Sequence, residues 1–306
     1  MRTRVSLIAI AVLCLAVSAH AGIELHQEHS FAARPGAKVV VDVSFHKVEV
    51  IARPGDTVDV SVDIEVKGDG SGSKNALNEL QPKFLEEGNK LIIRSTRKNG
   101  FRWKSVSAKG LVKVQMPPGM DLVVDASSGS AEISGDFGDA KVSFDASSGS
   151  LTVRGSMREL HSDTSSGSVR AELDRPLDAF NADASSGSVR LQGGAHKARV
   201  DTSSGSINLA GLLGNAGFDA SSGSITAQWD AIPADAKVRA GASSGNVTLR
   251  FPVGTVLTGS ADTSSGGIRT DFPGDLQDSH LKLSGGTGAV DVEIDTSSGG
   301  VRLIAD

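Results

Sequence analysis

The tripeptide Ser-Ser-Gly occurs nine times between residues 127 and 299, and this repetition constrains the fold more than any other feature. Successive motif glycines lie 18 to 22 residues apart, except for a last step of 33 residues. We interpret Gly288-Ala289-Val290 as a degenerate copy inside that step. A period near twenty is typical of one small supersecondary unit per repeat, so the sequence predicts about ten short coils. The motif glycines are Gly129, Gly149, Gly167, Gly187, Gly205, Gly223, Gly245, Gly266 and Gly299.

Polarity alternates on both sides of each motif glycine. Apolar Leu151 and Val153 alternate with polar residues after one glycine, and Val142 and Phe144 do so before it. Successive side chains of a strand face opposite sides, so each repeat is expected to be strand, corner, strand and loop. Two strands of about five residues bury too little surface to be stable alone and must stack on neighbouring coils. The predicted fold is an all-β, parallel β-solenoid (β-helix), right-handed by the general preference of parallel crossovers.

The Asp and Gly of the motif suggest how the corners form. Glycine supplies a positive φ without steric cost, and an aspartate just before a turn can accept hydrogen bonds from backbone N–H groups. Stacking would align the carboxylates in a ladder at strand spacing. We expect a solvated structural ladder without metal or other cofactor, with calcium bridging as the alternative. The ladder aspartates are Asp125, Asp145, Asp163, Asp183, Asp201, Asp219, Asp262 and Asp295.

The first 21 residues resemble a secretory signal peptide. Arg2 and Arg4 precede an apolar run over residues 5–17, and Ala19-His20-Ala21 is a small-x-small cleavage site. The run is too short for a membrane span, and no later segment is long enough, so we expect no transmembrane segment. Cys14, the only cysteine, lies within the run, which leaves the mature chain without a thiol.

The short signal peptide and the absence of disulfides favour an exported bacterial protein of the periplasm or cell surface. Removing Arg2 and Arg4 from the 31 basic residues leaves 29 against 36 acidic ones, a net charge of −7. This balance argues against a nucleic-acid partner. We expect a signal peptide over 1–21, a strand-rich capping segment over 22–120 that continues into the solenoid, and solenoid repeats over 121–306.

The capping segment keeps the strand pattern without the repeat. Valines and Ile64 alternate with polar residues over 58–66, as in a half-buried strand. Ser73 is a candidate N-cap for a short helix that places Leu77, Leu80 and Phe84 on one face and is limited by Pro82. We expect this helix to cover the open edge of the first coil.

One loop is basic in an otherwise acidic chain. It runs from residue 94 to residue 104 and interleaves basic residues with aromatic ones. This composition suits an anionic polymer or a lipid headgroup, although a solvated hairpin loop explains it as well. The candidate ligand-binding residues are Arg94, Arg97, Lys98, Arg102, Trp103 and Lys104.

No catalytic constellation emerges. The carboxylates and arginines recur with the repeat, whereas an enzyme site should depart from the repeat at one place. The departures are Gly241 in place of the motif Asp, His161 and His196 in predicted loops, and Trp229-Asp230 in a longer loop. A pocket needs several convergent groups, so we predict no catalytic residue.

The repeated Ser-Ser-Gly-Ser-Val-x-Leu coils after a strand-rich start resemble the bacterial family of domains of unknown function catalogued as putative adhesins. The resemblance covers about Ala33 to Leu303, and Gly129-Ser130, Gly245-Asn246 and Gly266-Gly267 fit the family's usual form. It implies a solenoid and surface adhesion, and it brings no catalytic residues.

We therefore predict a non-catalytic adhesin or interaction scaffold of the cell envelope, whose partner is an envelope protein or glycan. Two alternatives stay open: a lyase or glycosidase acting on polysaccharide, and a periplasmic envelope-stress or assembly accessory protein. Residues 301–304 would be an exposed strand edge, which predicts end-to-end homo-oligomers.

Overall fold

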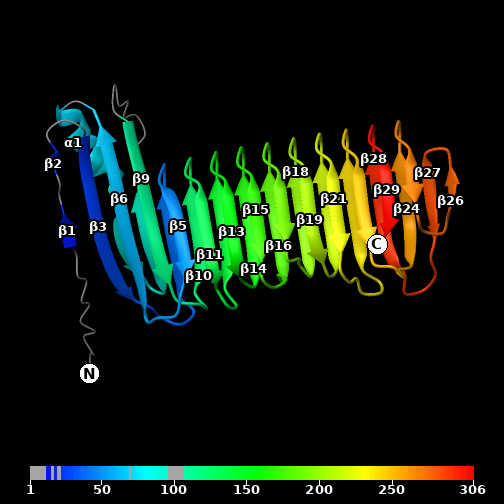
Figure 1. The fold of residues 1–306 in the computed structure, drawn as a ribbon, viewed down its shortest axis with the longest axis horizontal. Coiled ribbons are helices and arrows are strands. Elements are labelled where there is room, and N and C mark those ends of the chain that lie inside the picture. Colours follow the sequence, from blue (N-terminus) through cyan, green and yellow to red (C-terminus); the bar gives the residue numbers. More distant parts are fainter. Residues whose placement is uncertain (1–11, 15–16, 19–21, 69, 96–106) are drawn as a thin grey trace. The chain divides into compact units, whose positions relative to one another are not determined.

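The computed structural model describes residues 12–14, 17–18, 22–68, 70–95 and 107–306. The chain divides into two compact units, Met1–Gly149 (unit 1) and Ser150–Asp306 (unit 2). Both contain stacked parallel β-solenoid coils, which confirms the predicted fold class (Figure 1). In the parts of the chain that the structure describes, no helix has the length and apolar character needed to span a membrane.

Unit 1 contains twelve strands and one helix among its described residues. They are β1 (Val12–Cys14), β2 (Val17–Ser18), β3 (Gly22–Ala32), β4 (Lys38–Val43), β5 (Lys47–Ala52), β6 (Thr57–Lys67), α1 (Gly70–Leu80), β7 (Lys83–Glu87), β8 (Lys90–Ser95), β9 (Ser107–Met116), β10 (Asp121–Ala126), β11 (Ala131–Asp136) and β12 (Lys141–Ala146).

Unit 1 has two sheets that face each other across its core. In the first, β1 and β2 both pair with β3, and β6, β9, β5 and β11 follow in that order. Pairing is antiparallel from β1 to β9 and parallel from β9 to β11. The second sheet has the order β12, β10, β4, β8 and β7, and only β7 pairs antiparallel.

The helix of unit 1 differs from its predicted form. It begins at Gly70, three residues before the expected cap Ser73, and ends at Leu80. Pro82 explains this end, because a proline disfavours helical geometry in the residue before it. Phe84 lies in β7, outside the helix, so its predicted place on the helical face is wrong. Leu77 and Leu80 are buried as expected.

The sequence pattern missed one solenoid corner, Ser44-Phe45-His46 between β4 and β5. Asp42 lies opposite Asp125 in register, which extends the aspartate ladder by one position. A Cβ added to Gly129 would lie 1.9 Å from the carbonyl oxygen of His46, so His46 occupies the place of a corner glycine. Gly288 instead has a φ of 79° in the turn before β28, and its interpretation as a degenerate corner is wrong.

Unit 2 is all strand and turn within its described residues. Its strands are β13 (Leu151–Ser156), β14 (Glu159–Thr164), β15 (Val169–Leu173), β16 (Ala179–Ala184), β17 (Val189–Gln192), β18 (Lys197–Thr202), β19 (Ile207–Leu212), β20 (Asn215–Ala220), β21 (Ile225–Trp229), β22 (Lys237–Ala242), β23 (Val247–Phe251), β24 (Leu257–Thr263), β25 (Ile268–Thr270), β26 (Gly274–Gln277), β27 (His280–Ser284), β28 (Val290–Thr296) and β29 (Val301–Ala305).

The last coil of the chain is not the last coil of the stack. One sheet of unit 2 runs from β13 through β23 in steps of two and then to β29 and β25. The other runs from β14 to β22 in the same way and then to β28, β24, β27 and β26. The coil β28–β29 is therefore inserted before the coil β24–β25. Residues 301–304 pair with β23 on one side and β25 on the other, so the predicted exposed edge there is wrong.

The corner glycines are required for a reason other than the predicted one. None of the motif glycines described in units 1 and 2 has a positive φ. A Cβ on Gly205 would instead lie 1.8 Å from the carbonyl oxygen of Gly187, and one on Gly223 would lie 1.8 Å from that of Gly205. The coils approach so closely at the corner that only hydrogen fits between them.

The hydrogen bond that closes several corners comes from threonine. The Thr202 hydroxyl donates to the Gly205 carbonyl at 2.7 Å, and the Thr164 hydroxyl donates to that of Gly167 at 2.8 Å. No backbone N–H of the described residues donates to a ladder aspartate, so the predicted aspartate cap is wrong. The Asp side chains point to solvent, where carboxylates remain hydrated.

Aromatic residues fill one end of the unit 2 core. The Trp229 ring stacks on Phe251 with 4.8 Å between centroids, and Phe272 meets Phe251 edge-on at 5.8 Å. Trp229 is 2% exposed, and its indole N–H donates to the Gly214 carbonyl at 2.8 Å. Trp229 is therefore a core residue.

Candidate functional site

A concavity lies on the outer face of β3, β6, β9 and β5. Alternate residues of these strands point inward to the core, which leaves the intervening polar residues outside. The strand register aligns them in rows across the sheet: His26 lies opposite Asp63, and Leu111 lies between Asp63 and Lys47. We call this surface the outer face of unit 1.

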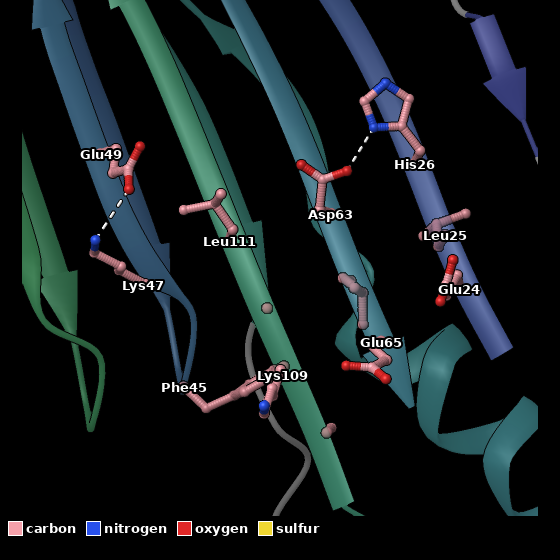
Figure 2. Close-up of a pocket in the computed structure, with 13 residues that line it drawn as sticks. Glu24, Leu25, His26, Phe45, Lys47, Glu49, Asp63, Glu65, Lys109 and Leu111 are labelled. Atoms are coloured by element: carbon pink, nitrogen blue, oxygen red, sulfur yellow. Dashed lines mark hydrogen bonds and ion pairs between the residues drawn. The ribbon is translucent and has the colours of Figure 1, made fainter. Parts of the chain in front are cut away.

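A pocket of about 770 Å³ occupies part of this face (Figure 2). Ligand sites commonly have volumes of about 300–1,000 Å³, so the pocket is large enough for a small molecule or a few sugar units. Phe45, at the missed corner, lies at its edge, and Leu111 lies between the Lys47–Glu49 and His26–Asp63 pairs (Figure 2). The pocket thus combines apolar surface with charges of both signs.

Charges are segregated across the face. The β3–β6 side carries carboxylates, and the β9–β5 side carries three lysines together with Glu49. Lys47 is paired at 3.0 Å with Glu49 and at 3.1 Å with Glu132. Neither Lys109 nor Lys113 makes a close ion pair within the described ranges, although Lys109 lies opposite Glu65 and helps to lower the pKa of that carboxyl. The acidic side comprises Glu24, Glu28, Asp59, Asp63 and Glu65, and the lysines are Lys47, Lys109 and Lys113.

His26 belongs to a half-exposed ion triad. Asp63 Oδ1 lies 2.6 Å from its Nδ1, and this contact raises the pKa of His26, to which Glu28 at 3.4 Å also contributes. A raised pKa favours the imidazolium, whereas a general base must be neutral. The triad therefore suits binding of a polar group better than proton abstraction.

A buried histidine lies directly beneath the pocket. His46 is fully buried, and a Cβ on the pocket residue Gly110 would lie 2.2 Å from His46 Cδ2. Apart from a weak contact with the Leu80 carbonyl, its ring nitrogens have no hydrogen-bond partner among the described residues. Burial lowers the pKa of His46 to about 4, and the Leu80 carbonyl only partly opposes this. The neutral ring packs against Phe45 at 4.2 Å between centroids and supports the pocket edge from below.

A second hollow of about 450 Å³ continues along the same face. It is lined by Glu28, Ser30, Asp59 and Lys113, among others. Asp59 accepts hydrogen bonds from Ser30 and Arg53 at 2.6 Å each, and these partners lower its pKa against the opposing effect of burial. The two hollows follow consecutive rows of the sheet, so an extended ligand could occupy both.

The structure places only one residue of the predicted basic loop. Arg94 is the penultimate residue of β8 and pairs through Nε with Asp42 at 2.7 Å, which makes it part of the aspartate ladder in unit 1. Arg97, Lys98, Arg102, Trp103 and Lys104 lie outside the described residues. The loop's role as a binding site stays a prediction.

The ladder aspartates align as stacking requires. In unit 2, Asp163, Asp183, Asp201 and Asp219 lie in consecutive register and line a groove of about 460 Å³. Burial and the neighbouring Asp201 and Asp163 raise the pKa of Asp183. Across the described residues, no group of three or more His, Cys, Asp or Glu side chains is arranged to hold a metal ion.

The residues that depart from the repeat pattern do not come together in one pocket. His161 lies within β14, outside any loop, and contacts Asn181 at 3.4 Å. His196 is exposed between β17 and β18, Trp229 is in the core, and Gly241 lies opposite Asp219.

Sequence reasoning missed the outer face because its residues are scattered from residue 24 to residue 113. The alternation over 58–66 did identify β6 as half-buried, but its outward residues gave no local signal. Only the antiparallel order β3, β6 and β9 brings them together.

Comparison with known proteins places the chain in a family. Residues 38–303 match the family described as Toastrack DUF4097. This chain belongs to the Toastrack DUF4097 family. The match confirms the resemblance drawn from the repeats. No curated protein matches the chain.

Three solved structures resemble the chain over most of its length. A putative adhesin of Parabacteroides merdae is 13% identical, with 91% of this chain and 96% of that one covered and a TM-score of 0.47. A putative lipid binding protein of Parabacteroides distasonis is 14% identical (91% and 96% covered, TM-score 0.45), and a putative adhesin of Bacteroides fragilis is 9% identical (91% and 97%, TM-score 0.40). These similarities are too distant to transfer a ligand.

Proposed function

We propose that this Toastrack protein is an exported, non-catalytic binding scaffold of the bacterial cell envelope and that the outer face of unit 1 is its ligand site. The observation that carries the proposal is the pairing of a large pocket with segregated charges on one rigid sheet. A site built on strands holds its groups in place without the entropy cost of ordering loops.

The charges favour an envelope glycan that carries both ammonium and carboxylate or phosphate groups. Lys109 and Lys113 lie four residues apart on β9 and face the same side, so they can meet successive anionic groups of a chain. The carboxylates of β3 and β6 would meet its ammonium groups. Phe45 offers an aromatic surface at the edge, on which a sugar ring can pack.

Charge reversal tests the proposal. The mature chain is mixed with a washed polysaccharide fraction of its own cell envelope, and the bound fraction is measured by co-sedimentation. Lys109→Glu with Lys113→Glu should weaken binding by about tenfold, since about 1.4 kcal/mol corresponds to tenfold and two exposed pairs together contribute up to about 2 kcal/mol. Added salt should weaken binding of the wild type as well.

The matched control reverses two lysines of the opposite sheet, Lys83→Glu and Lys90→Glu, which changes the net charge equally. Equal loss in both double variants would show a non-specific charge effect and refute the site. Release of new reducing ends by the wild type, abolished by His26→Gln, would instead support the glycan-cleaving alternative.

A further inference from the structure

Strand β3 has one edge that the solenoid does not use. Its other edge pairs with β6 over ten residue pairs. The first edge holds β1 and β2, which share one antiparallel register: Val12 lies opposite Glu28, and Val17 lies opposite Ile23 (Figure 1). This edge can therefore accept an antiparallel strand.

β1 and β2 lie within the first 21 residues, which we predict to be removed on export. Removal would expose the backbone donors and acceptors of an eleven-residue strand. Such an open edge recruits another strand unless it is covered. The mature protein thus needs a different occupant for the place that β1 and β2 hold.

We propose that the occupant is β3 of a second copy, paired antiparallel across a two-fold axis at Gln27. β3 spans residues 22–32, so pairing along its full length places Gln27 at the centre. An antiparallel pair of identical strands is two-fold symmetric and forms a closed dimer. The inference goes beyond glycan binding and does not depend on it.

The full-length register is complementary on both faces. On the outer face it places His26 opposite Glu28 of the second copy, and His26 already lies within 3.4 Å of Glu28 of its own chain, so this carboxylate–imidazole contact is compatible with the strand surface. On the inner face it places Ile23 opposite Phe31. Opposite charges and apolar pairs directly across two strands are the favourable combinations in sheets.

Other registers of the β3–β3 pair bring unfavourable side chains together. A shift by two residues places Glu28 opposite either Glu24 or its own copy, and like charges directly opposite destabilise a sheet. A shift by one residue would set outer-face side chains against inner-face ones. The sequence of β3 therefore favours one register.

Gln27 supplies independent support. In the structure, where Leu13 of β1 lies opposite it, Gln27 is 8% exposed and points to the inner face, and its Oε1 has no hydrogen-bond donor among the described residues. A buried acceptor without a donor is costly. In the proposed dimer two Gln27 side chains face each other, and each carboxamide N–H can donate to the Oε1 of the other copy.

A cysteine scan tests the register. The mature chain has no cysteine, so Gln27→Cys introduces a single thiol. Directly opposed Cα atoms lie about 4.5–5.5 Å apart, within disulfide range. Glu28→Cys is the matched control, because it would be about 8 Å from its own copy, beyond the reach of a disulfide.

We expect the wild-type mature chain to sediment as a dimer that dissociates on dilution. Gln27→Cys should form a disulfide-linked dimer, and Glu28→Cys should do so only when mixed with His26→Cys. A wild-type monomer at every concentration, an intact mass that still includes residues 1–21, or linkage of Glu28→Cys alone as fast as Gln27→Cys would overturn the proposal. The assay contains no glycan, so its failure is distinct from failure of the binding site.

Discussion

Replacing Gly205 by alanine tests how the coils fit together. The added Cβ would lie 1.8 Å from the Gly187 oxygen and 2.5 Å from its carbonyl carbon. Carbon and oxygen do not approach within about 3 Å, so the coils must separate locally by more than about 1 Å.

The cost follows from the bonds that flank this contact. Ser204 N–H donates to the Ser185 carbonyl at 2.9 Å, and Val189 N–H donates to that of Ser206 at 3.0 Å. Separation would weaken both, at about 1 kcal/mol each, and overpacking adds about 1–3 kcal/mol. The free energy of unfolding should therefore fall by about 3–5 kcal/mol.

Urea denaturation measures the effect, with Gly217→Ala as the matched control. Gly217 lies in β20 with open space around its Cα and without a positive φ. Alanine should be neutral or slightly stabilising there, because glycine weakens a strand. Equal stability of the two variants would refute the close-approach explanation.

Three further predictions concern single side chains. Thr202→Ala removes the buried hydroxyl that donates to Gly205 and should cost about 1–2 kcal/mol of unfolding free energy, measured by urea titration. His46 has a pKa lowered to about 4 in the folded state against about 6.5 unfolded, so its contribution is complete above pH 6.5 and is lost as pH falls toward 4. His46→Leu should remove up to about 3 kcal/mol of this acid sensitivity; an unchanged pH profile would contradict it. Asp183→Asn relieves repulsion from Asp163 and Asp201 and should stabilise the fold by up to about 1 kcal/mol at neutral pH, with no gain below the unfolded pKa near 3.9; destabilisation that appears only with calcium would instead support a bridging ion.

The solenoid could be predicted because the Ser-Ser-Gly motif recurs once in each of most coils. Gly205 and its counterparts recur at coil spacing, since the same close approach recurs at one Ser-Ser-Gly corner after another. The corner at His46 could not be predicted in this way, because a buried histidine stands in place of the glycine and the Ser-Ser-Gly motif is absent.

The order of the last coils could not be predicted. β28 and β24 both carry an apolar inner face and an outward aspartate. Their sequence patterns therefore fit either stacking order of the coils β24–β25 and β28–β29. The outer face depends on antiparallel pairing of β3, β6 and β9, which alternation alone does not specify. Solvent-facing charges such as Lys109 and Asp63 look the same in sequence whether or not a pocket forms around them.

Photo-crosslinking in living cells tests most directly whether the outer face of unit 1 is the ligand site. A photoreactive residue replaces Leu111 at the centre of that face, and the control replaces Asn208, an exposed residue of β19 in unit 2. Our account predicts a glycan-containing adduct from position 111 and none from position 208. No adduct from position 111, or equal adducts from both positions, would contradict it.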